Sequence, residues 1–141
     1  MFTGLEKRIV RKLFVLIFIA ISFLPLAGKD SSFLESYRRE SKKRSLNLLV
    51  YFYREGCQYC SHMDTYVLSE PEVDALIKDN FVFAALNLDK KEVREVGNEY
   101  RIFATPSFLF LSPSGVVLHA HSGSMELENF IQMLKKYSKS K

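Results

Sequence analysis

The residues best suited to chemistry in this sequence are its only two cysteines, Cys57 and Cys60, which belong to one Cys-Gln-Tyr-Cys motif. The motif follows an apolar run and precedes a helical pattern. A cysteine in the first turn of a helix has its thiolate stabilised by unpaired backbone N–H groups and the helix dipole, so its pKa falls below the free value of about 8.5. We therefore expect Cys57 to be the attacking thiolate and Cys60, one turn later, to be the resolving thiol.

Two alternatives to redox chemistry are open for this pair. The same spacing forms half of many zinc sites, and a copper or zinc carrier would take further ligands from His62, His119 or His121. A plain structural disulfide is the other alternative, but it would close a very small loop and remove little unfolded-state entropy. The strand-to-helix position favours redox exchange, with no cofactor and no bound metal. The histidines are then surface positions, with His62 facing solvent on a helix and the other two pointing outward from an edge strand.

The chain has 141 residues and a net charge of +4, and most of this charge lies at its N-terminal end. Four basic side chains in residues 1–28 precede an apolar run that is shorter than the ~20 residues needed to span a bilayer. A basic region, a short apolar region and small residues at its end are the parts of a secretory signal peptide. We predict that residues 1–28 are a signal peptide or an uncleaved membrane anchor, and that the protein is periplasmic or otherwise extracytoplasmic. Thiols in such a compartment meet oxidants.

Residues 29–141 are long enough for one compact domain, which we expect to be a monomer. This part is nearly neutral and lacks a basic stripe, which argues against nucleic-acid binding. Residue patterns predict helices over 31–44, 57–66, 72–80, 91–100 and 126–137, and strands over 46–53, 81–88, 107–111 and 116–120. Strands separated by helices favour a parallel arrangement, whereas the Ser-Pro-Ser-Gly turn makes the last two antiparallel. The predicted fold is α/β, a mixed central sheet with helices on both faces.

Two separated motifs resemble the thioredoxin superfamily. Residues 49–60, which read Leu-Val-Tyr-Phe-Tyr-Arg-Glu-Gly-Cys-Gln-Tyr-Cys, are similar to that family's second strand and active-site turn. Residues 100–111, Tyr-Arg-Ile-Phe-Ala-Thr-Pro-Ser-Phe-Leu-Phe-Leu, resemble the segment that carries its cis-proline, while Gly115 and Gly123 match its hairpin turn and the glycine before its last helix. The resemblance covers nearly all of the exported part. It implies a thioredoxin-like fold with a redox-active disulfide between the two cysteines.

The resemblance also implies how a substrate is held. Thr105 and Pro106 would share a cis bond packed against the cysteines, leaving the Thr105 backbone to pair with an extended substrate strand. Gln58 and Tyr59, between the cysteines, are further expected substrate contacts. The stretch from Cys60 to the proline is too short for the helical insertion of DsbA-type oxidants.

The resemblance is thus to small exported thioredoxin-like proteins such as the SoxW-like group. It implies a thiol–disulfide oxidoreductase that acts on protein or peptide disulfides. The small body without insertions favours a reductant, supplied with electrons by a membrane or other extracytoplasmic redox partner.

Three departures from thioredoxin itself concern the surroundings of the cysteines. Gly56 stands where thioredoxins have a tryptophan, which implies a more open surface beside Cys57. Tyr51 stands where they bury an aspartate that helps to deprotonate the resolving thiol, and Ala85 aligns with that aspartate's lysine partner. A tyrosine with an ordinary pKa of about 10 is a poor base. We therefore expect water or a substrate group to accept the proton of Cys60.

Overall fold

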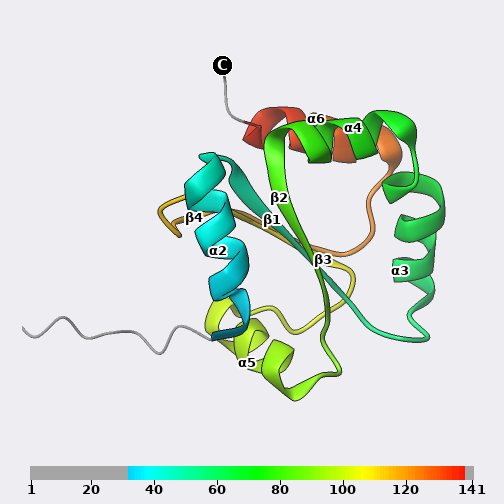
Figure 1. Ribbon diagram of the computed structural model, residues 1–141. Coiled ribbons are helices and arrows are strands. Elements are labelled where there is room, and N and C mark those ends of the chain that lie inside the picture. The colour runs from blue at the N-terminus through cyan, green and yellow to red at the C-terminus, as the bar shows by residue number, and fades with distance from the viewer. Residues whose placement is uncertain (1–31, 139–141) are drawn as a thin grey trace, which may run out of the picture. The chain divides into compact units, whose positions relative to one another are not determined.

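The computed structural model describes residues 32–138, so the predicted signal segment, residues 1–28, lies outside the described residues. The described chain contains one sheet of four strands in the order β2-β1-β3-β4 (Figure 1). The strands are β1 (Asn47–Tyr53), β2 (Phe81–Asn87), β3 (Ser107–Leu111) and β4 (Val117–Ser122). β1 runs parallel to β2 and antiparallel to β3, and β4 is antiparallel to β3. The predicted mixed sheet is confirmed.

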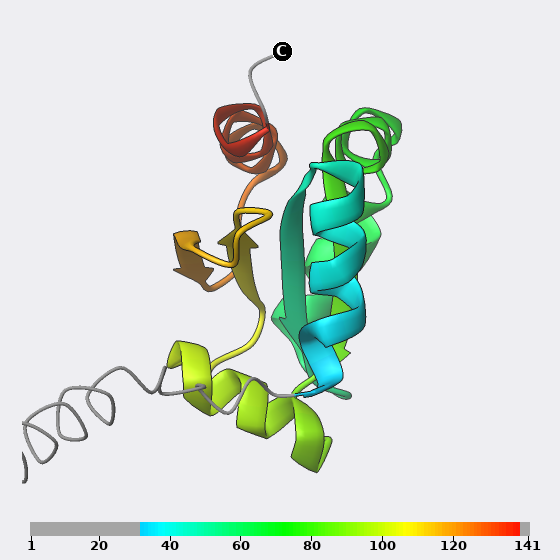
Figure 2. The same ribbon diagram turned by 60° about the vertical axis from the view of Figure 1, so that its left-hand side comes forward.

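Helices cover both faces of this sheet, as predicted. They are α2 (Ser32–Arg44), α3 (Gln58–Met63), the π-helical turn η1 (Asp64–Leu68), α4 (Pro71–Asn80), α5 (Lys91–Tyr100) and α6 (Leu127–Tyr137). α2 and α5 pack on one face, and α3, η1, α4 and α6 pack on the other. Figure 2 shows that α5 lies at one end of the sheet while α4 and α6 lie at the other. Within residues 32–138, no helix has both the length and the apolar character to cross a membrane.

The central strand β1 explains why the core has two halves. Leu48, Val50 and Phe52 belong to the cluster under α2 and α5, whereas Leu49 and Tyr51 belong to the cluster under the other helices. Side chains alternate between faces along a strand, so a strand covered on both faces is apolar throughout.

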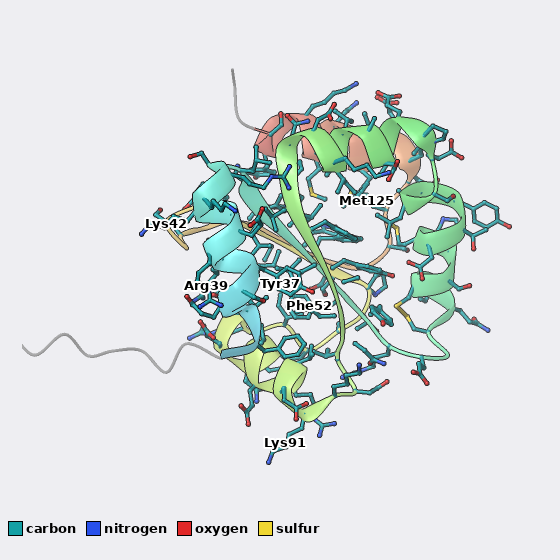
Figure 3. All side chains as sticks on the ribbon, viewed as in Figure 1. Tyr37, Arg39, Lys42, Phe52, Lys91 and Met125 are labelled. Atoms are coloured by element: carbon teal, nitrogen blue, oxygen red, sulfur yellow. A yellow bond between two sulfur atoms is a disulfide. The ribbon has the colours of Figure 1, made fainter. Side chains whose placement is uncertain are left out.

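The outward-facing sides of the helices carry charged residues, in contrast to the apolar central strand. Figure 3 shows Tyr37 of α2 lying toward the sheet and Phe52 of β1 lying in the interior, while Arg39, Lys42 and Lys91 project outward from their helices. These three charged side chains therefore stay in water, whereas the two aromatic ones contribute to the packed interior.

The expectation that helix-separated strands run parallel is wrong for β3. Tyr53 pairs with Asn87, and the neighbouring Phe52 pairs with Ser107, the first residue of β3. β3 therefore begins at the end of the sheet where β1 and β2 finish. The reason is that α5 stays at this end instead of returning along the sheet, so the chain re-enters the sheet in the opposite direction (Figure 1).

The turn after α5 sets the course of the loop that leads into β3. Arg101 has a left-handed conformation, φ 58°, and the N–H of Ile102 donates to the carbonyl of Gly97 at 2.7 Å. This pattern closes a helix by satisfying its last carbonyl groups. A Cβ on Gly97 would lie 2.7 Å from the Ile102 carbonyl oxygen and 2.9 Å from Leu88 Cδ1. Only glycine fits here without a shift of the backbone that carries residues 102–106.

We predict that Gly97→Ala lowers the free energy of unfolding by about 1–3 kcal/mol, because the added methyl group overpacks a site bounded by backbone. Urea denaturation measures the effect. Glu95→Ala, on the exposed side of the same helix, is the matched control and is expected to change stability by less than about 0.5 kcal/mol. Equal stability of the two variants would contradict the packing argument.

Candidate active site

The two cysteines meet at the carboxyl end of β1. Cys57 and Cys60 form a disulfide with Cα atoms 5.2 Å apart. Cys57 is the N-cap of α3, and its Sγ accepts a hydrogen bond from the backbone N–H of Cys60 at 3.2 Å. Cys57 is partly exposed, whereas Cys60 is only 2% exposed. An incoming sulfur therefore reaches Cys57 first, which fits the roles expected from the sequence.

The loop before β3 packs against this disulfide. The Thr105–Pro106 peptide bond is cis. The Thr105 hydroxyl donates to Cys57 Sγ at 3.6 Å. The Thr105 carbonyl oxygen lies 3.7 Å from the same sulfur. The carbonyl of Pro106 accepts a hydrogen bond of 2.8 Å from the N–H of Gly123, where φ is +111°. The structure thus places Thr105 beside Cys57, next in the chain to the cis-proline Pro106.

Ser107 fixes this loop from the interior, and the sequence reasoning did not single it out. Its side chain is fully buried, and its hydroxyl donates to the carbonyl of Ala104 at 2.8 Å. The same hydroxyl lies 2.9 Å from the Ser122 hydroxyl on β4. A serine at the start of an apolar strand is the only local signal for this role.

The surface around the disulfide is partly aromatic. Gln58 and Tyr59 are both exposed, and the Tyr59 side chain is 67% exposed. Phe103, on the loop two residues before Thr105, is 64% exposed. Aromatic side chains are enriched where proteins contact one another. Phe103 is a candidate contact that motif spacing did not reveal.

A hollow of about 460 Å³ opens beside the motif. Residues from the end of β1, the turn and α3 line it: Tyr53, Arg54, Glu55, Gly56, Cys57, Gln58, Cys60, Ser61 and Asp64. Gly56, which has no side chain, is among these residues. The hollow also gives the buried Cys60 a route to solvent.

Tyr51 lies under the motif, where thioredoxins have an aspartate. Its ring is 3% exposed and stacks on Phe108 with centroids 5.0 Å apart, and its hydroxyl donates to the carbonyl of Cys60 at 3.4 Å. Burial above all, and then the neighbouring Asp64 carboxylate, raises the pKa of Tyr51 well above its ordinary value. Ala85 is its partner on β2 and adds no charge. Tyr51 is therefore a neutral hydrogen-bond donor.

The histidines on β4 do not point outward, which corrects the expectation from the sequence. His119 lies opposite Phe110, and His121 opposite Phe108, so both histidines share the face of β3 that these buried rings occupy. The ring of His119 stacks on Tyr137 with centroids 5.0 Å apart. The edge strand is covered on this face by α6, which is why the alternation of polar residues does not mark the solvent side here.

The described part of the chain contains no set of side chains that would support the metal-binding alternative. His62 is exposed on α3, as expected, and its ring lies 5.2 Å from that of Tyr66. His119 is packed against aromatic rings, and burial is the main cause that lowers its pKa. Among residues 32–138, no group of three or more His, Cys, Asp or Glu side chains is placed to hold a metal ion.

Known proteins share both this fold and this sequence pattern. A family model described as a thioredoxin-like domain matches residues 34–138. A thioredoxin from Thermus thermophilus is 32% identical, covering 72% of this chain and 81% of its own, with a TM-score of 0.67. No curated protein sequence matches the chain.

Two more distant structures show likeness of fold alone. The reduced C-terminal domain of DsbD from Neisseria meningitidis is 21% identical, covering 77% of this chain and 96% of its own, with a TM-score of 0.63. A disulphide isomerase from Xylella fastidiosa is 15% identical, covering 81% of this chain and 95% of its own, with a TM-score of 0.64.

We predict that Tyr51→Phe makes stability less sensitive to alkaline pH. Above about pH 10 the unfolded chain releases the Tyr51 proton, whereas the raised pKa makes the native state keep it. The native state then binds more protons, so stability falls as pH rises. Urea denaturation across alkaline pH should give a shallower decline for Tyr51→Phe than for the wild type, while parallel curves would contradict this origin. At neutral pH the variant should lose about 1 kcal/mol with the hydrogen bond to Cys60.

Proposed function

The chain belongs to the thioredoxin-like domain family, and we propose that it reduces disulfides in proteins or peptides outside the cytoplasm. It is a thiol–disulfide oxidoreductase whose reactive group is the Cys57–Cys60 pair. The observation that carries the proposal is the disulfide at the N-terminus of α3 with Thr105 against its accessible sulfur.

The geometry supports a two-step exchange. In the reduced protein, the Cys57 thiolate attacks one sulfur of the substrate disulfide, which breaks and releases one substrate thiolate. Cys60 then loses its proton and attacks Cys57 Sγ, and the second substrate sulfur leaves with the electron pair of the broken bond. Two electrons pass to the substrate, and the Cys57–Cys60 disulfide forms. The backbone N–H of Cys60 and the Thr105 hydroxyl both point at the Cys57 sulfur, where they favour its charged form.

The proposal that electrons flow from this protein to its substrate is supported by the small size of the domain. Only η1, α4, β2 and α5 lie between α3 and the proline loop, so no additional subdomain is inserted in this part of the described chain. This body resembles the thioredoxin from Thermus thermophilus, with which it shares 32% identity. The oxidised pair must then be reduced again, and we propose a membrane or extracytoplasmic thiol donor as the redox partner. The fold is shared with the C-terminal domain of DsbD, a structure known in reduced and oxidised forms.

The location outside the cytoplasm rests on residues 1–28, whose basic and apolar parts match a signal peptide or N-terminal anchor. In a compartment of this kind the pair meets oxidised proteins, so a reductant has substrates there.

We predict that the reduced protein reduces the disulfides of insulin and that Cys57→Ser abolishes this turnover, because no thiolate is left to attack. Precipitation of the insulin B chain measures it. Cys60→Ser should instead accumulate a mixed disulfide between Cys57 and the insulin chain, visible by non-reducing electrophoresis. Undiminished turnover by Cys57→Ser would refute the proposal.

We also predict export. The full chain with a C-terminal tag, expressed in a Gram-negative bacterium, should appear in the periplasmic or membrane fraction, and deletion of residues 2–28 should retain it in the cytoplasm. A membrane-bound full-length form would identify an anchor, and a shortened soluble form would identify a cleaved signal. Recovery of the full chain in the cytoplasm would overturn the proposed location.

A further inference from the structure

The second step of the exchange needs a proton acceptor for Cys60. This requirement rests on the proposed function, in which Cys60 attacks the mixed disulfide. Only the thiolate is an effective nucleophile, and burial in apolar surroundings disfavours the charged form. Cys60 is 2% exposed, and it lines the hollow beside the motif. A group lining that hollow is therefore best placed to take the proton.

Tyr51 does not meet the requirement. Its hydroxyl already donates to the Cys60 carbonyl oxygen, and the raised pKa keeps it protonated. Its neighbour on β2, Ala85, has no ionisable group. The base must come from elsewhere in the site.

Two carboxylates line the hollow, Asp64 and Glu55. Asp64 lies one helical turn after Cys60, and its backbone N–H donates to the Cys60 carbonyl, so its position is fixed relative to that residue. The Asp64 carboxylate also acts on the Tyr51 hydroxyl, which contacts the same carbonyl. Glu55 precedes the motif on the Cys57 side, and its Oε1 accepts from Asn87 Nδ2 at 3.5 Å. The contacts therefore favour Asp64.

We propose that Asp64 accepts the proton of Cys60 in the second step, with Tyr51 as the residue that positions the Cys60 backbone. The Asp64 carboxylate takes the proton from Cys60 Sγ, the thiolate attacks Cys57 Sγ, and the substrate thiolate leaves. When a donor later reduces the Cys57–Cys60 disulfide, the Asp64 carboxylic acid returns the proton to the departing Cys60 sulfur.

The charges around Asp64 allow this role. The other ionisable groups that line the hollow are Tyr53, Arg54 and Glu55, and Tyr51 lies beneath. The Arg54 Nε is 3.4 Å from Asp89 Oδ1, so this cation is already paired with a different carboxylate. Asp64 is exposed, so it exchanges protons with solvent between turnovers.

The test separates the two steps with the reduced full chain and the aromatic disulfide dithiobis(nitrobenzoate). Attack by Cys57 releases the first nitrothiobenzoate, and attack by Cys60 on the resulting mixed disulfide releases the second. Cys60→Ser, which should give only the first release, assigns the two phases. Asp64→Asn should leave the first phase unchanged and slow the second about a hundredfold near neutral pH, the lower end of what a positioned acid or base contributes.

The pH profile and rescue distinguish proton transfer from a structural effect. In Asp64→Asn the rate of the second phase should rise in proportion to hydroxide concentration, whereas in the wild type it should depend less steeply on pH. Asp64→Glu should restore most of the rate. Asp79→Asn, which removes an exposed acid from α4, is the matched control and should not change either phase.

Three results would overturn the assignment. They are an unchanged second phase in Asp64→Asn, a loss of rate that is equal at every pH, and a loss confined to Glu55→Gln. Failure of the wild type to reduce insulin, with both phases of release intact, would instead refute the proposed function and leave the role of Asp64 standing.

Discussion

The position of the Cys57 sulfur is the constraint on which the rest of the site depends. It is bounded by the N–H of Cys60, at 3.2 Å, and by the hydroxyl of Thr105, at 3.6 Å. The first contact is local, because a helix begins at the motif. The second joins residues 48 positions apart, and it exists because β1 ends at the motif while β3, its antiparallel neighbour, begins just after Pro106. The central strand pairing therefore places the loop on the sulfur.

The site must bury the resolving thiol and also provide an acid–base group for it, and these two requirements conflict. The resolving thiol is held in the interior, where a charged neighbour is costly to bury. This chain places a neutral phenol, Tyr51, in the interior under Cys60, and an exposed acid, Asp64, in the lining of the hollow. The carboxylate keeps its hydration, and the buried cysteine still faces a space that the carboxylate lines. An open hollow beside Gly56 is the geometric condition for this arrangement.

Local patterns predicted most of the elements. The run from Leu48 to Phe52 is apolar at every position, and the structure divides it between two halves of the core, as a strand covered on both faces requires. Pro71, which interrupts the helical pattern, is the first residue of α4. The direction of β3 was not predictable in this way, because it depends on how α5 packs at the end of the sheet. The two histidines on β4 were misplaced for a related reason, since α6 covers that face of an edge strand.

The order of residues along the chain is enough to single out the two cysteines and to predict that Cys57 attacks before Cys60. Cys57 and Cys60 lie three positions apart at a junction between strand and helix, so one cysteine caps the helix and the other follows one turn later. The tertiary structure determined what surrounds them: Thr105 on the Cys57 sulfur, Tyr51 beneath the Cys60 carbonyl, and Asp64 at the rim of the same hollow. The periodic pattern of apolar residues indicates only which side of its own helix or strand a residue occupies. Contacts of this second kind depend on strand order and helix packing between distant segments, and only the folded chain fixes those.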